Sequence, residues 1–403
     1  MSQLGQSGGE TAPAFFGARI ALLYSALFFF VGIYLPFFPL WLSSRGLDAT
    51  SISLVLAAPL VARIATSGQI TAFADRASDR ANVLIFLFCT AAIIVSLFPF
   101  VSGFWAILAV ALALSIATNP LTPVMDSLTL SGVRRYGASY GRIRLWGSLV
   151  FILANLGGGA VLAGYDAETV LWVMIASAFA GAALSPLLPR IGRPRRQVHG
   201  IGPGSASLLR LPRFTLVMLA SGLLQASHAM IYGFGSIHWG SIGYSGTLIG
   251  LLWAIGVMVE ILLFHFAATV FRKVSPLNLV VIGAFGSMMR WGLIPLEPPL
   301  AGYVFLQMLH GLSFGAVHLG TMHFLAAEIP DERMGAAQGI AFVLGGAVMA
   351  VAVLLSGPLY AAFGVAAFLA MAAMSVLALI LLAIVAGSYP QSLLEGGETR
   401  DVE

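Results

Sequence analysis

Three ionisable side chains lie inside stretches of sequence that are otherwise apolar and long enough to cross a membrane. Glu260 is near the centre of residues 248–271, and Arg63 and Arg290 are isolated in the same way in other stretches. An ionisable group at the middle of a bilayer costs about 3 kcal/mol or more unless it faces a partner or a water-filled cavity. In a chain with only 9% charged residues, these three groups predict a polar passage through a membrane.

Other polar side chains fall near the middle of neighbouring apolar stretches, and we expect them to share one cavity with the three charges. They are Asn119, Asn155, Gln225, His228, His310 and His318. Asn119 precedes Pro120, so a helix kink with satisfied backbone groups is our interpretation there. For Asn155 and Gln225, hydrogen bonding between helices and contact with a ligand are equal alternatives. His228 is either a hydrogen-bonded core residue or a ligand contact.

Four residues are candidates for proton coupling, and Glu260 is the one expected to exchange the proton. Glu260 and Arg290 lie on adjacent stretches at similar depth, so we expect an ion pair between them. Burial disfavours a charged carboxylate and a nearby arginine favours it, so motion that changes this contact would change proton affinity. His310 and His318 are eight residues apart, about 80° around a helix, and imidazole titrates near neutral pH. A purely structural ion pair and hydrogen-bonded core histidines are the alternatives.

The balance of charge predicts the kind of solute. Arg63 and Arg290 oppose Glu260 alone, and the surplus positive charge favours an anion, most simply a carboxylate held by a guanidinium. Asp126 and Arg144 form a second candidate pair near the cytoplasmic ends of two stretches joined by one loop. A gate or interface salt bridge is the first interpretation of this pair, and contact with substrate is the second.

The composition defines the class of protein that must position these groups. Hydrophobic residues make up 59% and the mean hydropathy is +0.96, whereas soluble domains contain roughly 25% charged residues. Long apolar runs without alternation predict an all-α membrane protein. The basic residues are spread over several short loops, which membrane topology explains better than nucleic-acid binding. Cys89 is the single cysteine, so we expect no disulfide or metal framework.

Twelve apolar stretches of about 20 residues predict twelve transmembrane helices in two six-helix halves. The stretches are 17–41, 50–73, 82–101, 104–126, 142–164, 169–188, 214–238, 247–271, 277–295, 300–325, 336–358 and 364–387. The predicted organisation is a cytoplasmic tail (1–16), an N-terminal six-helix bundle (17–188), a cytoplasmic linker (189–213), a C-terminal six-helix bundle (214–387) and a cytoplasmic tail (388–403).

Arginine and lysine gather in alternate loops, and the positive-inside rule therefore places both termini and the central loop in the cytoplasm. We expect a multi-pass protein of a bacterial inner membrane that acts as a monomer. Its expected partners are the lipid bilayer, protons and a small-molecule solute, with no nucleic acid, no metal and no cofactor beyond the proton gradient as energy source.

Several segments resemble the phenylpropionate permease family of the major facilitator superfamily, which is related to lactose permease-type proton symporters. They are residues 140–148 (YGRIRLWGS), 224–234 (LQASHAMIYGF), 290–292 (RWG) and 307–311 (QMLHG). The resemblance implies uptake of a small solute, for example an aromatic acid, with a proton, and it places Tyr232 among the substrate contacts. Residues 73–80 (FADRASDR) also resemble the loop signature of the superfamily at Asp75, Arg76 and Arg80, where we expect helix capping and gating.

The lactose permease-like layout of charges is also similar. It places an acidic residue, two arginines, a carboxylate and a histidine at the positions of Asp126, Arg144, Arg290, Glu260 and His318. That layout has a further carboxylate one turn after the histidine, where this chain has Thr321. Glu260 would therefore carry the proton more directly, with His318 or His310. The sugar specificity of the relative is not carried over.

We therefore expect a secondary active transporter that takes up a small organic anion, an aromatic carboxylate such as phenylpropionate, together with a proton. A sugar or nucleoside proton symporter and a proton-driven exporter are the alternatives within transport. A membrane enzyme would need a nucleophile–base constellation or metal-ligand spacing, and the sequence has neither. A solute sensor would usually need an output domain, whereas the longest predicted cytoplasmic loop has about 25 residues.

Overall fold

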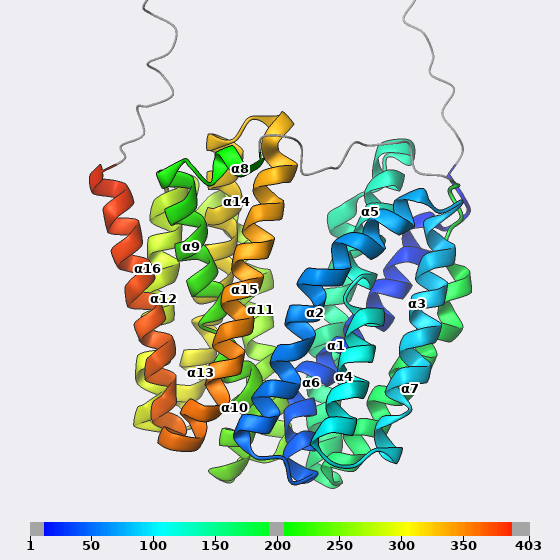
Figure 1. The fold of residues 1–403 in the computed structure, drawn as a ribbon, viewed down its shortest axis with the longest axis horizontal. Helices are drawn as coiled ribbons and strands as arrows, with labels where there is room; N and C mark the ends of the chain where they lie inside the picture. Colours follow the sequence, from blue (N-terminus) through cyan, green and yellow to red (C-terminus); the bar gives the residue numbers. More distant parts are fainter. Residues whose placement is uncertain (1–11, 193–204, 389–403) are drawn as a thin grey trace, which may run out of the picture. The chain divides into compact units, whose positions relative to one another are not determined.

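A computed structural model describes residues 12–192 and 205–388, and every regular element in these ranges is helical (Figure 1). The described residues contain 11 apolar helical stretches long enough to cross a membrane. The last of them, Asp331–Ser388, has 58 residues and holds two helices, α15 (Asp331–Phe363) and α16 (Phe368–Ser388). One helix of that length would measure about 87 Å, far more than the roughly 30 Å of a hydrocarbon core. Each of the two helices is thus a span, and the predicted twelve-span all-α fold is confirmed.

Most of the other helices begin and end within a few residues of the predicted stretches, but the fourth span, predicted to end at 126, continues to Tyr136. The first six stretches contain α1 (Phe16–Ser44), α2 (Ala49–Arg76), α3 (Arg80–Val95), α4 (Phe104–Thr118), α5 (Leu121–Tyr136), α6 (Tyr140–Gly164) and α7 (Ala167–Leu184). The later part contains α8 (Ser205–Leu208), α9 (Pro212–Ala226), α10 (Ala229–Ser241), α11 (Gly246–Val270), α12 (Pro276–Leu293), α13 (Leu300–Met308), the π-helical segment η4 (Gly311–Ala316) and α14 (Val317–Glu328).

Three spans are interrupted, and each interruption lies at a polar residue. The span of α4 and α5 breaks at Asn119 and Pro120, because proline lacks the N–H that continues a helix. The Asn119 side chain donates to the backbone carbonyl of Pro59 at 3.4 Å, which agrees with the predicted kink. The span of α9 and α10 breaks at Ser227 and His228, and η4 separates α13 from α14.

Short polar side chains begin several helices by accepting a hydrogen bond from the first turn. These N-cap residues are Asp48, Asp79, Ser139, Asp166 and Ser275. Asp48 and Asp166 lie outside the spans. Hydrogen bonds from backbone N–H groups to each carboxylate hold the pKa of that carboxyl below its ordinary value.

Packing divides the chain into two compact units, Met1–Val198 with Ser236–Ala254, and His199–Gly235 with Ile255–Glu403. In the first unit α1 packs on α6 and α7, and in the second α9 packs on α15 and α16. The start of α11 belongs to the first unit because Gly246 and Gly250 lie directly against Gly159 of α6. The predicted bundle boundaries stay a prediction. Most of each predicted tail falls outside the described residues, and so does the middle of the linker.

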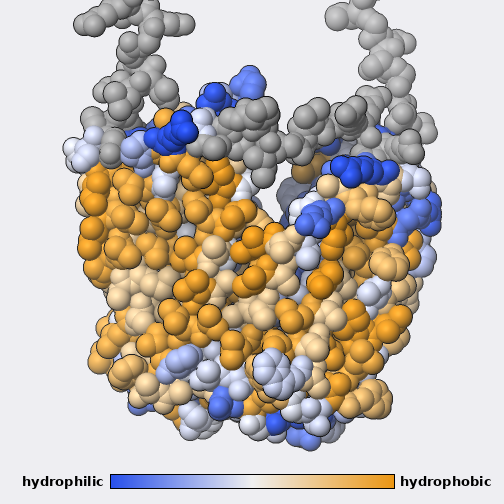
Figure 2. Space-filling model, in the orientation of Figure 1, coloured by the Kyte–Doolittle hydropathy of each residue, from blue (hydrophilic) through white to orange (hydrophobic). Residues whose placement is uncertain are grey.

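The helix flanks of each unit carry exposed large hydrophobic side chains, which suits contact with lipid rather than water. Phe86, Trp105, Leu153 and Ile380 are each more than half exposed. Figure 2 shows hydrophobic residues along the helix flanks on the face in view, with hydrophilic residues gathered near the helix ends. The described part of the chain is therefore built as a multi-pass membrane protein.

Candidate functional site

Arg290 on α12 is the centre of a polar cluster inside the second unit, where it is only 2% exposed. Its Nη1 donates to His310 Nδ1 at 2.9 Å and to Ser313 Oγ at 3.1 Å, and its Nη2 donates to Gln307 Oε1 at 2.5 Å. The guanidinium carbon lies 4.4 Å from the ring centroid of Trp291. The buried Nε has no hydrogen-bond partner among the described residues. A buried charge is thus held by one imidazole, one hydroxyl and one amide.

His310 joins Arg290 to Glu260. A guanidinium can only donate, so His310 Nδ1 must accept and the ring hydrogen must be on Nε2. Nε2 lies 3.4 Å from Glu260 Oε2, so the ring N–H faces the carboxylate. The structure therefore inserts His310 between two side chains that the sequence analysis placed in direct contact. The side chain of Glu260 is 20% exposed, and that of His310 is 12% exposed.

The π-helical segment η4 explains how His310 reaches this position. Wider π turns often occur at functional sites, and they rotate the residues on either side relative to a straight α-helix. Two glycines within η4 let α11 approach, since a Cβ at Gly311 would lie 2.8 Å from Val259 Cγ1 and one at Gly315 would lie 3.3 Å from Leu263 Cδ2. The ring of Phe314 is stacked between those of His310 and His318, and the three rings form one column. The Phe314 centroid lies 5.2 Å from that of His310 and 6.5 Å from that of His318. His310 is nearly buried in this column, whereas His318 is exposed.

His228 lies at the break between α9 and α10 and is fully buried. Its Nδ1 is 3.3 Å from the carbonyl of Leu224 and 3.1 Å from that of Gln225, and its Nε2 is 3.3 Å from Ser313 Oγ. Tyr232 stacks on the His228 ring with a centroid distance of 5.8 Å. His228 and Tyr232 therefore belong to the Arg290 cluster, and half-buried Gln225 contributes a backbone carbonyl to it.

A second polar cluster lies inside the first unit. The carboxylate of Asp126 on α5 accepts hydrogen bonds from the hydroxyls of Tyr24 and Tyr140, the latter at 3.1 Å. The guanidinium carbon of Arg144 lies 3.9 Å from the ring centroid of Phe28 and 5.4 Å from that of Tyr24. Its Nη1 is buried and has no hydrogen-bond partner among the described residues.

The salt bridge predicted between Asp126 and Arg144 is absent from the ion pairs of the described residues. The physical reason is that two tyrosine hydroxyls already satisfy the carboxylate, while the guanidinium stacks on an aromatic face. Arg144 therefore keeps a charge that Asp126 does not compensate by direct contact.

Asn155 and Arg63 are the remaining residues of the first unit that were predicted to lie near the substrate. Asn155 on α6 is completely buried, and neither atom of its amide has a hydrogen-bond partner among the described residues. Such orphaned amides are rare in folded proteins, so the site needs an explanation. Arg63 on α2 is half-buried, one turn after Pro59. Both stay candidates for contact with substrate.

The predicted gating residues form a compact cluster in which Arg80 is the central side chain. Arg80 is 8% exposed and donates to Asp75 Oδ1 through Nε at 3.0 Å and Nη2 at 2.6 Å. Its Nη1 donates to Ser131 Oγ on α5 at 2.8 Å. Arg76 is exposed, so Asp75 pairs with the later arginine rather than with its neighbour. Their role in gating stays a prediction.

Thr321 occupies the position where the lactose permease-like layout has a carboxylate. Its hydroxyl contacts Ser221 Oγ on α9 at 2.8 Å and its own helix at Val317 O. This position thus ties two helices together, and Glu260 is the carboxylate that faces the histidines of this span.

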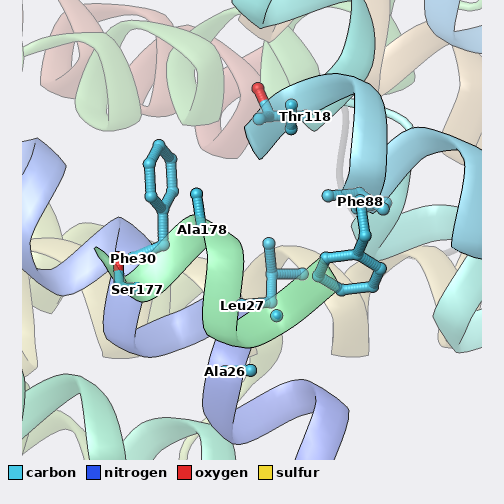
Figure 3. A pocket seen from close by; sticks show the side chains of 10 residues that line it. Ala26, Leu27, Phe30, Phe88, Thr118, Ser177 and Ala178 are labelled. Atoms are coloured by element: carbon cyan, nitrogen blue, oxygen red, sulfur yellow. The ribbon is translucent and has the colours of Figure 1, made fainter. Parts of the chain in front are cut away.

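A small apolar pocket in the first unit offers no charged group. Its lining comes from α1, α3, α7 and the α4–α5 break, and Figure 3 shows the side chains around it. The two hydroxyls in the lining, those of Thr118 and Ser177, donate to carbonyls of their own helices. This pocket is a gap in helix packing and has no group that would hold an anion.

The membrane-spanning helices of the described residues, with a buried polar cluster inside each unit, are those of a multi-pass membrane transporter. The chain belongs to the MFS_1 like family, which matches residues 18–371.

Two curated relatives align over most of this chain. The "Probable 3-phenylpropionic acid transporter" of Escherichia coli (strain K12) is 31% identical over 372 residues, covering 90% of this chain and 96% of the relative. The "Maltose permease" of Geobacillus stearothermophilus is 24% identical and covers 78% of this chain and 79% of the relative.

Solved structures confirm the fold. The nucleoside transporter NupG has a TM-score of 0.81 at 17% identity, covering 91% of this chain and 98% of that one. A bacterial homologue of the human lysosomal transporter Spinster has a TM-score of 0.75 at 13% identity, covering 94% of this chain and 98% of the other. At these identities the likeness extends to the fold alone.

Proposed function

We propose that this transporter takes up a small organic anion, an aromatic carboxylate such as 3-phenylpropionate, together with a proton. The relative that is 31% identical carries 3-phenylpropionic acid in its name, which supports this class of solute. The proposal includes a bacterial inner membrane, cytoplasmic termini and a monomer. It needs no bound cofactor, because the proton gradient supplies the energy.

The environment of the Arg144 guanidinium is the observation that carries the proposal of an anionic solute. Its guanidinium rests on Phe28, and a buried Nη1 donor lacks a partner among the described residues. Carboxylates match the fork of a guanidinium with two parallel hydrogen bonds, so an anion would satisfy this donor. The rings of Phe28 and Tyr24 supply the apolar surface that an aromatic acid requires.

The coupling step would use Glu260 and His310. Protonation of Glu260 removes the negative charge that the His310 N–H faces, and this weakens the link from Glu260 to Arg290. A proton could thus change the arrangement around Arg290 without any change in the bound solute. Such a dependence is what coupling between a proton and a conformational change requires.

Substitution of Arg144 tests the anion site. We expect Arg144→Gln to raise the KM for 3-phenylpropionate about 10- to 100-fold, because a charge-assisted bidentate contact is lost. Inhibition by the neutral 3-phenylpropionamide should change by less than about threefold. Arg142→Gln is the matched control, since Arg142 is exposed two residues earlier on the same helix.

Uptake of labelled 3-phenylpropionate in cells or proteoliposomes measures these effects. An equal loss for the acid and the amide would contradict the proposed role of Arg144. Competition by maltose or uridine, with no effect of 3-phenylpropionate, would instead support a sugar or nucleoside symporter.

A further inference from the structure

We propose that His228 is a positioning residue for Arg290, acting through Ser313, and that it neither contacts the substrate nor carries the proton. The inference rests on the proposed function only where transport is the readout, because the hydrogen bonds that carry it lie within the second unit. It assigns a role to the break between α9 and α10, which the proposed mechanism leaves unused.

The neighbours of Nδ1 decide which nitrogen of the His228 ring carries the hydrogen. Both of its polar neighbours, the backbone oxygens of Leu224 and Gln225, can only accept. Nδ1 must therefore carry the hydrogen. A helix end leaves carbonyl groups without partners, and α9 ends at Ala226, so the imidazole helps to satisfy the carbonyls of this last turn.

Full burial close to the Arg290 guanidinium favours a neutral ring, in which Nε2 is then the side with the lone pair. Its neighbour at 3.3 Å is Ser313 Oγ, which must donate its single hydrogen to Nε2. The Ser313 oxygen is left with lone pairs only, and one of them accepts from Arg290 Nη1 at 3.1 Å. The donors and acceptors thus form one directed chain, from Arg290 through Ser313 and His228 to the end of α9.

The surroundings of His228 exclude the other two roles. The residue is 0% exposed, and the rings of Trp291, His310, Phe314 and Tyr232 lie 5.1, 5.3, 5.8 and 5.8 Å from its own. The titratable or charged groups around it are Tyr232 on α10, His310 before η4, and Arg290 on α12 through Ser313. A second ring proton would add a positive charge to a fully buried site close to the Arg290 guanidinium, and it would turn Nε2 from an acceptor into a donor toward Ser313.

An independent set of contacts ties the same break to Arg290. Ser227, the neighbour of His228, accepts from Trp291 Nε1 at 2.8 Å. Trp291 also donates to Ser287 at 2.9 Å, and Ser375 on α16 contacts Ser287 at the same distance. The ring that lies beside the Arg290 guanidinium is therefore fixed to the break as well.

Two amide substitutions test the roles of the two ring nitrogens of His228 separately. The shorter side chain in His228→Asn cannot reach Ser313 but keeps a donor near the Nδ1 position, so this substitution removes the chain to Arg290. His228→Gln keeps an acceptor near the Nε2 position. We expect His228→Asn and Ser313→Ala each to lower the proton-driven accumulation ratio of 3-phenylpropionate about fivefold while exchange of internal for external substrate is retained, because Arg290 is joined to Glu260 through His310. The double variant should be no worse than either single one, because both break one chain.

His228→Gln is expected to keep the KM within about twofold and to keep the pH profile of uptake and the accumulation ratio of the natural protein. A loss of proton-driven accumulation in this variant, or a shifted pH profile, would overturn the inference, because a proton carrier cannot be replaced by an amide. Additive effects in the double variant would also overturn it.

Thermal unfolding of the same purified variants, without substrate, gives a second readout. The inference predicts non-additive shifts in Tm for His228→Asn and Ser313→Ala, and additive shifts contradict it. This readout does not depend on transport. If the natural protein fails to transport carboxylates, the proposed function fails, and the Tm cycle still decides the role of His228.

Discussion

Buried guanidinium groups determine the chemistry of this protein at the scale of single residues. A charge taken out of water is tolerated when hydrogen bonds and counter-charges replace its hydration. Arg290 meets this requirement through hydrogen bonds to neutral groups. One of these groups, the imidazole of His310, also faces Glu260. Arg80 meets it through a carboxylate and a hydroxyl, whereas Arg144 has a buried donor without a partner among the described residues. These three environments imply three different consequences of substitution.

Arg80 and Arg76 provide a matched pair for stability. Arg80→Ala should lower the free energy of unfolding by about 2 kcal/mol, because it removes a mostly buried cation and leaves Asp75 unpaired. The partial exposure of Asp75, at 41%, keeps the effect below that of a fully buried pair. Arg76→Ala should change stability by no more than about 0.5 kcal/mol, since the residue is exposed.

Unfolding of the two variants in the same detergent, followed by intrinsic fluorescence, compares these effects. Equal destabilisation by both substitutions would show that the pairing of Asp75 with Arg80 is wrong.

Residue types in apolar stretches were enough to predict Glu260, Arg290 and His310 as one group. Neutral residues that complete the cluster could not be predicted in the same way. Gln307 and Ser313 carry no charge, and a serine within a helix usually donates to a backbone carbonyl of the same helix. Neither residue is therefore unusual in an apolar stretch of sequence. The direct pair of Asp126 with Arg144 was wrong because Tyr24, which binds the carboxylate instead, is 102 residues away from Asp126 along the chain.

At the scale of elements, helix breaks and glycines decide how close the polar groups come. Hydropathy predicted most helix bounds to within a few residues, since a span must bury a full length of apolar side chains, but it missed the continuation of α5 to Tyr136. It could not predict η4, because a π turn changes the winding of a helix without changing its composition. The Pro120 break was predictable from the missing N–H of proline.

The crossing of α6 with α11 gives the prediction that belongs to this scale. A Cβ at Gly250 would lie 2.2 Å from the backbone oxygen of Asn155 and 3.1 Å from Gly159 Cα, so Gly250→Ala must force the helices apart. We expect a loss of about 2 kcal/mol in stability from this overpacking. Gly157→Ala is the control, because no atom lies within 4 Å of its Cβ position.

The control should be neutral or stabilising by up to about 1 kcal/mol, as alanine favours a helix more than glycine does. Thermal unfolding of both variants measures the difference. A stable Gly250→Ala protein would contradict the close crossing.

At the scale of the whole molecule, composition predicted a membrane protein, long apolar runs without alternation predicted helices, and the count of these runs predicted twelve spans. The solute is less determined by sequence. The excess of arginines over carboxylates in the apolar stretches predicts an anionic solute. The shape of the binding site depends on side chains brought together from distant spans, such as Phe28 and Arg144. The proposed carboxylate therefore rests on local chemistry and on the relative that is 31% identical.

Proton coupling through Glu260 is the central claim, and uptake into proteoliposomes under an imposed proton gradient tests it most directly. The natural protein should accumulate labelled 3-phenylpropionate, and a protonophore should abolish the accumulation. Glu260→Gln should lose accumulation while it retains exchange of internal for external substrate, because the amide cannot release a proton. Accumulation by Glu260→Gln at the level of the natural protein, or uptake that ignores the proton gradient, would contradict the account.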